Sequence, residues 1–267
     1  MKAKIIAIVN QKGGVGKTTT TFNLGTALNK KGHRVLMVDF DPQSNLSVYA
    51  GVEPSEDGKT VKTAMENIIN EETLNEGIII QLKDGLDLVP SSNDLAGAER
   101  VLSSVSNGKK ILRLYLDSLR DAYEFILIDC GPTLGELSVN ALVAADSVLV
   151  PVKAEYLSII GCEQLMNSII RTRNHLNRTL TIEGILLTMA NTRTRSFRDL
   201  NELLRDTFRG KFKVYDTVIP LSVKAADSAM YGKSVIDYAP RSRVSGAYIA
   251  LAAEFSKVTN QVDTATT

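Results

Sequence analysis

The sequence predicts an α/β fold, with a mainly parallel, twisted β-sheet flanked by helices on both faces. Short apolar runs recur along the chain, several are separated by segments of helical periodicity, and no linker rich in glycine, proline or serine interrupts them. Strands that alternate with helices form βαβ units, whose parallel strands are covered on both sides. We therefore expect residues 1–258 to form a single domain and the small, polar residues 259–267 to form a disordered tail.

The expected strands are short apolar runs that end in small, acidic or proline residues. Such runs are typical of strands buried on both faces. Ligands of open α/β sheets bind at the carboxyl ends of the strands, so the residues after each run are the first candidates for a site. The runs are Ile5–Val9, Val35–Val38, Leu86–Val89, Phe125–Ile128, Val148–Val150, Ile185–Leu187 and Val218–Ile219.

The expected helices lie between several of these runs. Gly32 follows the first of them, as glycine often does at the end of a helix. The last one carries apolar residues at helical spacing, namely Val244, Ala247, Leu251 and Phe255. The predicted helices are Thr18–Lys31, Lys109–Leu119, Ile159–Leu176, Phe197–Phe208 and Ser242–Val258.

Composition excludes several classes of protein. The 267 residues are 44% hydrophobic, which is enough for a sizeable core. No apolar run approaches the roughly 18 residues of a membrane span, and the first one is too short for a signal peptide. Cys130 and Cys162 are too few for a disulfide framework or a four-cysteine metal site. We therefore expect a cytoplasmic protein with reduced thiols.

The formal net charge of +1 hides an uneven distribution of charge. Residues 53–99 contain 11 acidic and 3 basic side chains, whereas residues 171–213 contain 10 basic and 4 acidic ones. A basic segment of this size is compatible with a polyanionic partner, although most charged runs are solvated helix faces.

The stretch QKGGVGKTT, residues 11–19, follows the first predicted strand and opens the first predicted helix. It resembles the phosphate-binding loop G-x-x-x-x-G-K-[ST], except that Gln11 replaces the first glycine. The strand, loop and helix context makes a plain glycine turn a poor alternative. Lys17 is expected to bridge the β- and γ-phosphates, and the Thr18 hydroxyl to bind Mg²⁺. The expected nucleotide-binding residues of the loop are Gly13, Gly14, Val15, Gly16, Lys17, Thr18 and Thr19.

Three carboxylates follow two of the predicted strands. Asp39 and Asp41 come after the second run, where one could support the metal and the other could orient a water for attack on the γ-phosphate. The alternative for this pair is a polar turn with a helix-capping role. Asp129 follows the run 125–128, as in a Walker B strand, and is expected to hold Mg²⁺. Together with the loop, these residues predict a Mg-nucleotide site.

These motifs, in this order, closely resemble the ParA/Soj-type partition ATPases within the deviant Walker A, or MinD-like, group of P-loop NTPases. The resemblance spans most of the chain. It rests on the segments Lys12–Thr20, Val38–Asn45, Leu88–Glu99, Phe125–Gly135, Asn140–Gly161, Leu187–Thr194 and Ile219–Tyr248.

The resemblance implies an ATP hydrolase that requires Mg²⁺ and dimerises face to face around two ATP molecules. Lys12 would then reach across to the nucleotide of the partner and act in catalysis with Lys17 and Asp41; the alternative for Lys12 is a solvated surface lysine. Asp41 would position the attacking water, and Asp39 would support the magnesium shell together with Thr18 and Asp129. Slow hydrolysis would be stimulated by a ParB-like protein.

The resemblance also assigns a switch and a base-binding wall. Residues 130–136 resemble the second switch, which responds to the γ-phosphate. This chain reads Cys-Gly-Pro where relatives often have two consecutive prolines, so the conformation of the switch can differ. Asn191 and Pro220 are expected on the adenine side of the nucleotide.

Members of the partition branch bind double-stranded DNA without sequence preference when ATP has made them dimers, and segregate a plasmid, chromosome or mobile element. The same function here would associate the ATP-bound protein with the nucleoid. Leu221 departs from the family, because relatives often carry a basic residue at that position. The candidate DNA-contacting residues are Arg171, Arg193, Arg195, Arg198, Lys224 and Arg241.

The main alternative is a MinD-type ATPase that anchors to membranes through a basic amphipathic C-terminal helix. Here the sequence ends in VTNQVDTATT, which lacks basic residues and bulky apolar tips, so no membrane partner is expected. An iron protein of the nitrogenase type would need a second cysteine in residues 93–100, and none is present. A bacterial tyrosine kinase would need a clustered tyrosine tail, which is also absent.

Overall fold

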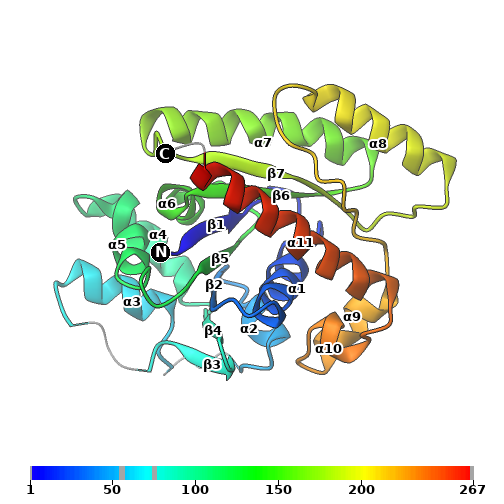
Figure 1. Ribbon diagram of the computed structural model, residues 1–267. Helices are drawn as coiled ribbons and strands as arrows, with labels where there is room; N and C mark the ends of the chain where they lie inside the picture. Colours follow the sequence, from blue (N-terminus) through cyan, green and yellow to red (C-terminus); the bar gives the residue numbers. More distant parts are fainter. Residues whose placement is uncertain (1, 54–57, 74–76, 265–267) are drawn as a thin grey trace.

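A computed structural model describes residues 2–53, 58–73 and 77–264 of the chain. Its centre is a seven-stranded sheet with the order β3-β4-β2-β5-β1-β6-β7 (Figure 1). All neighbouring strands are parallel except β3 and β4. This confirms the predicted fold class. The strands are β1 (Lys4–Ile8), β2 (Val35–Phe40), β3 (Ile80–Lys83), β4 (Leu86–Val89), β5 (Phe125–Cys130), β6 (Ser147–Lys153) and β7 (Thr181–Thr188).

Two strand expectations need correction. Strand β3 was not predicted, because it is short, partly exposed and pairs antiparallel at the edge of the sheet. The run Val218–Ile219 was expected to be a strand, but the adjacent ladder contact is an isolated bridge between Ala190 and Pro220. Proline has no N–H to donate, so a ladder cannot continue through it.

One face of the sheet is covered by helices that pack around α1 (Figure 1). Phe22, Leu24 and Leu28 of α1 are buried in an apolar core shared with Leu251 and Phe255 of α11. The helices of this layer are α1 (Lys17–Lys30), α2 (Asn45–Tyr49), α9 (Val223–Met230), α10 (Val235–Tyr238) and α11 (Arg243–Thr264). Because α1 follows the glycine-rich loop directly, this layer fixes the direction in which the loop opens.

The opposite face carries the second helical layer and the larger apolar core. Its helices are α3 (Val61–Ile69), α4 (Leu95–Ser104), α5 (Ile111–Asp117), α6 (Glu136–Ala144), α7 (Tyr156–His175) and α8 (Arg195–Phe208), with a 3₁₀ turn η1 (Gly108–Lys110) before α5. Both faces of the central strands are therefore buried, as continuous apolar runs require. No helix among the described residues is long and apolar enough to cross a membrane.

Helix α11 extends beyond the boundary that we expected. It runs to Thr264, so residues 259–264 are helical where a tail was predicted, and residues 265–267 lie outside the described residues. The segment contains neither glycine nor proline, which are the residues that most often end a helix.

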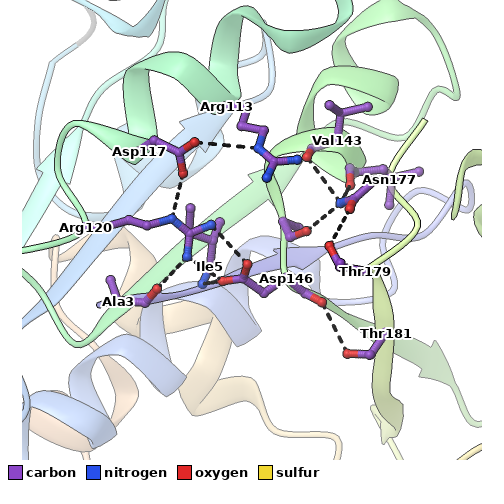
Figure 2. A network of polar contacts seen from close by, with 12 residues as sticks. Ala3, Ile5, Arg113, Asp117, Arg120, Val143, Asp146, Asn177, Thr179 and Thr181 are labelled. Atoms are coloured by element: carbon purple, nitrogen blue, oxygen red, sulfur yellow. Dashed lines mark hydrogen bonds and ion pairs between the residues drawn. The ribbon is translucent and has the colours of Figure 1, made fainter. Parts of the chain in front are cut away.

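The amino-terminal ends of the strands are joined by a polar network around Arg120 (Figure 2). Arg120 donates to the Ala3 carbonyl at 2.8 Å, to both carboxylate oxygens of Asp146 at 2.8 and 3.0 Å, and to Asp117 at 2.7 Å. Asp146 also accepts the Ile5 N–H at 2.8 Å. The network lies at the end of the sheet away from the glycine-rich loop and therefore serves stability.

Replacing Arg120 by alanine should lower the free energy of unfolding by about 2 kcal/mol, because it leaves the Ala3 carbonyl without its side-chain donor and removes two charge-assisted hydrogen bonds from the partly exposed Asp146 carboxylate. Arg113→Ala is the matched control, since the polar contact of Arg113 among the described residues is an ion pair with the partly exposed Asp117 at 3.6 Å, and its loss should cost below about 0.5 kcal/mol. Urea unfolding of the ligand-free protein measures both. Equal losses in the two variants would show that the network does not stabilise the strand ends.

Candidate functional site

The glycine-rich loop connects the end of β1 at Ile8 to the start of α1 at Lys17. Gly14 and Gly16 have φ angles of +67° and +85°, in the region that other residues rarely adopt. A Cβ atom on Gly13 or Gly14 would meet nothing within 4 Å, so the inner side of the loop is open. Free backbone N–H groups at a helix N-terminus bind anions, and this loop is therefore a phosphate-binding cradle by its geometry.

The loop forms one end of a cavity of about 590 Å³. Seven predicted nucleotide-binding or catalytic residues line it, together with Pro220 from the opposite wall. Val15 does not line the cavity: it is fully buried and its carbonyl accepts a hydrogen bond from the Thr188 hydroxyl at 2.8 Å, while the role of its backbone N–H stays a prediction. The predicted residues that line the cavity are Gly13, Gly14, Gly16, Lys17, Thr18, Thr19, Asp41 and Pro220.

Lys17 places a buried positive charge at the phosphate end of the cavity. Lys17 is only 8% exposed. Its ammonium group makes no hydrogen bond or ion pair within the described part of the chain. A buried charge without a partner is costly unless a ligand supplies the opposite charge. The position of Lys17 thus fits an anionic ligand.

Asp129 is the second-to-last residue of β5 and lies directly opposite Ile8 of β1 and Asp39 of β2. Its Oδ2 atom is buried and has no hydrogen-bond partner among the described residues. Burial raises the pKa of Asp129 to about 8, with a smaller contribution from the charge of Asp39, while a hydrogen bond with Thr18 lowers it. A buried carboxylate beside a threonine hydroxyl is an oxygen site suited to Mg²⁺, so Thr18 and Asp129 fit the metal role expected of them.

Asp39 has a different environment from the one we predicted. Its Oδ1 atom accepts the Asp41 N–H at 3.3 Å, and its Oδ2 atom accepts the N–H and the hydroxyl of Ser47 at 2.8 and 2.7 Å. Burial raises the pKa of Asp39 to about 7, although the hydrogen bonds from Ser47 lower it. The contacts of Asp39 therefore do not support its expected role in the metal shell.

Asp41 lies between the cavity and the predicted switch segment. It is 7% exposed and its Oδ1 atom accepts the Gln43 N–H at 3.0 Å. A Cβ atom on Gly131 would lie 3.4 Å from the same carboxylate, so glycine at 131 allows the close approach of the two segments. Asp41 is therefore near enough to the phosphate end to act there, and its role in positioning water remains a prediction.

Lys12 does not line the cavity of its own chain. Its ammonium group donates to the Ser158 hydroxyl at 2.9 Å and lies 3.4 Å from Glu155, at the start of α7. Glu155 also pairs with Lys153 at 2.5 Å. The side chain of Lys12 is 46% exposed, so it is available for contacts outside the chain.

The structure does not place Asn191 in the wall of the cavity, so its contact with the adenine stays a prediction. Asn191 is exposed and does not line the cavity, and its carbonyl accepts the N–H and hydroxyl of Thr194 at 3.1 and 3.0 Å in the turn before α8. Met189 lines the wall instead, with a φ angle of +51° and its methyl group 3.8 Å from the position of a Cβ on Gly16. Met189 follows the end of β7, where ligand-contacting residues of α/β sheets are expected, so its position after that strand was the available signal.

The six candidate DNA-contacting residues are all exposed, but they come from several elements. Arg193, Arg195 and Arg198 belong to the turn before α8 and its first residues, and Arg171 belongs to α7. Lys224 starts α9 and lies 3.9 Å from Asp227, whereas Arg241 precedes α11. The structure therefore brings three of the six into one segment.

Comparisons with known proteins identify the family of the chain. The family model described as an AAA domain matches residues 3–182. The chain is 42% identical to the sporulation initiation inhibitor protein Soj of Bacillus subtilis, over 94% of this chain and 97% of Soj. It is 40% identical to the chromosome partitioning protein ParA of Caulobacter vibrioides, over 94% of this chain and 93% of ParA.

Among solved structures, the fold is similar to that of cobyrinic acid a,c-diamide synthase from Mycobacterium smegmatis with bound ADP and magnesium. The TM-score is 0.79 with 31% identity, over 94% of this chain and 93% of that one. Sequence identity of this extent over nearly the whole length, together with a phosphate cradle in the expected place, shows that the chain belongs to the ParA/Soj family of P-loop ATPases.

Proposed function

We propose that this protein is an Mg²⁺-dependent ATP hydrolase that dimerises when ATP binds, associates with double-stranded DNA and partitions a DNA cargo. The observation that carries the proposal is that two groups beside one glycine loop have free binding capacity among the described residues: the ammonium group of Lys17 makes no hydrogen bond or ion pair, and the buried Oδ2 atom of Asp129 has no hydrogen-bond partner. The two charges suit a phosphate chain and the cation that accompanies it. The magnesium and ADP bound by the Mycobacterium smegmatis relative support this choice.

The residues of the loop would hold the nucleotide in defined roles. Backbone N–H groups of residues 13–19 would surround the phosphates, Lys17 would contact the outer phosphates, and Thr18 with Asp129 would hold Mg²⁺. The bound cation supplies charge neutralisation for the β- and γ-phosphates. Met189 and Pro220 would contact the nucleoside from the opposite wall of the cavity.

Hydrolysis would depend on two side chains with different origins. Asp41 lines the cavity and would orient the attacking water. Lys12 contacts Ser158 in its own chain, so its contribution to the γ-phosphate would be made to the nucleotide of a second copy. A positive group supplied in this way resembles an arginine finger, which accelerates hydrolysis by about 10³–10⁵-fold in other NTPases. Because hydrolysis would require Lys12 from a second copy, an isolated chain would hydrolyse ATP slowly.

The names of the relatives support a partitioning role. ParA is named as a chromosome partitioning protein, and Soj as an inhibitor of sporulation initiation. DNA contact would come from exposed arginines, mainly Arg193, Arg195 and Arg198. Contacts of this kind bind phosphates and carry no sequence preference. A ParB-like protein bound to the cargo would stimulate hydrolysis and release, and the ATP-bound form would lie on the nucleoid in the cytoplasm.

The experiment that tests this function is co-sedimentation with DNA and with liposomes. The protein with Mg-ATP should sediment with two unrelated duplexes equally well, and binding should fall steeply with salt, because each phosphate contact releases counterions. It should stay in solution with ADP and with anionic liposomes. Binding to liposomes but not to DNA would refute the proposal and favour the membrane-positioning function.

A further inference from the structure

Asp39, Ser47 and Ser91 form a buried hydrogen-bonded unit, which we call the Asp39 hub. All three residues have no exposed surface. Ser47 donates to Asp39 Oδ2 through its N–H at 2.8 Å and through its hydroxyl at 2.7 Å, and the same hydroxyl accepts the Ser91 N–H at 3.1 Å. The hub thus connects the end of β2 with α2 and with the segment that follows β4.

The hub holds both ends of the loop that carries Asp41. At one end the Asp41 N–H donates to Asp39 Oδ1 at 3.3 Å, and at the other end Ser47 donates to Oδ2. Within the loop, the Asp41 carboxylate accepts a hydrogen bond from the Gln43 N–H, and the Asp41 carbonyl accepts one from the Ser44 N–H. One carboxylate therefore fixes the start and the end of a short loop, and the position of Asp41 depends on both contacts.

A hydroxyl group at position 47 is required for the hub as it stands. The Ser47 hydroxyl oxygen accepts a hydrogen bond from the Ser91 N–H, and its hydrogen is donated to Asp39. A methyl group can neither accept the first bond nor donate the second. Water has no access to a residue with zero exposure, so removal of the hydroxyl leaves a buried carboxylate and a buried N–H less satisfied. The loop would then relax to other positions.

We infer that Ser47 is a positioning residue for ATP hydrolysis, which acts through Asp39 to hold Asp41 at the phosphate end of the cavity. The inference rests on the proposed function, since it assumes that Asp41 orients the attacking water. It also replaces the role that we predicted for Asp39: the carboxylate positions a loop and leaves the metal to Thr18 and Asp129.

The test compares Ser47→Ala with Ser47→Thr and Ser44→Ala. Ser47→Ala should lower kcat at least about tenfold, because small displacements of a catalytic group have large effects on rate. The KM for ATP and the Mg²⁺ concentration at half-maximal rate should stay unchanged. Ser47→Thr keeps the hydroxyl and should recover most of the lost rate. Ser44→Ala should leave kcat unchanged, because within the described residues the Ser44 hydroxyl makes one long hydrogen bond, to the Pro42 carbonyl at 3.5 Å, and none to Asp39 or Asp41.

Two results would overturn the inference. One is a kcat of Ser47→Ala equal to that of the unmodified protein, and the other is a shift in the Mg²⁺ requirement that accompanies the loss of rate, which would place the hub in the metal shell. If Ser47→Ala does not fold, as judged by thermal unfolding, Ser47→Cys has a similar volume with a weak S–H donor and is assessed by the same criteria.

Failure of the inference can be separated from failure of the proposed function. Asp41→Ala is measured in the same assay. If Asp41→Ala is inactive and Ser47→Ala is fully active, only the role of Ser47 is refuted. If Asp41→Ala itself hydrolyses ATP normally, the proposed role of Asp41 fails and the Ser47 inference fails with it.

Discussion

Replacing Asp41 by alanine should lower ATP turnover at least about 100-fold, which is the effect expected for loss of a side chain that orients or activates the attacking group. Asp41 lines the cavity and is nearly buried, and its carboxylate contacts only the Gln43 N–H among the described hydrogen bonds. ATP binding should persist, because the phosphate cradle and Lys17 are unchanged. Phosphate release at saturating ATP and binding of a fluorescent nucleotide analogue measure the two quantities.

The matched control for this substitution is Asp94→Ala. Asp94 is an exposed carboxylate at the N-cap position of α4 and makes no capping hydrogen bond through its side chain. Turnover of Asp94→Ala should equal that of the unmodified protein. Normal turnover of Asp41→Ala would exclude Asp41 as the residue that positions water, whereas a parallel loss of nucleotide affinity would assign it to binding.

Replacing Lys17 by alanine should weaken nucleotide binding about 100-fold, which corresponds to the loss of about 3 kcal/mol from charge-assisted hydrogen bonds to phosphate. The ligand-free protein should lose little stability, since no hydrogen bond or ion pair holds the ammonium group of the largely buried Lys17 in the described part of the chain. Relief from the cost of burying a charge offsets the loss of its electrostatic attraction to Asp129. Isothermal titration with Mg-ATP and urea unfolding without nucleotide measure the two effects.

Lys31→Ala is the control for the charge change, because Lys31 is exposed at the other end of α1. It should leave nucleotide affinity unchanged. If Lys17→Ala binds Mg-ATP as tightly as the unmodified protein, the cavity does not bind phosphates in the way that the glycine loop indicates. If Lys17→Ala unfolds in the absence of nucleotide, the lysine serves the fold.

Features that depend on consecutive residues could be predicted from the sequence. The loop 13–19 lies between a strand and a helix, and Asp129 lies near the end of the strand beside it, because the apolar run and the glycine pattern are both local. Parallel strands also place all their carboxyl ends at one edge, which is why Asp41 and Pro220 could be expected at the same cavity.

Features that depend on which hydrogen bonds the folded loops form could not be predicted. Asp39 was expected to face the metal, but Ser47 and the Asp41 N–H use its two oxygens, and no sequence pattern indicates that competition. Asn191 was expected in the wall of the cavity, but the turn that precedes α8 uses its carbonyl and leaves Met189 there. The contact of Lys12 with Ser158 joins residues 146 positions apart in the chain.

The central claim is that Lys12 serves the nucleotide of a second copy, and a mixing experiment tests it most directly. Lys12→Ala and Asp41→Ala should each hydrolyse little ATP alone. In a mixed dimer, the Lys12→Ala chain keeps Asp41 and would receive Lys12 from the Asp41→Ala chain, so one of its two sites is complete. The account predicts that mixing the two variants restores ATP turnover that neither has alone. Turnover that stays at the level of the separate variants, in samples that light scattering shows to be dimeric, would contradict it.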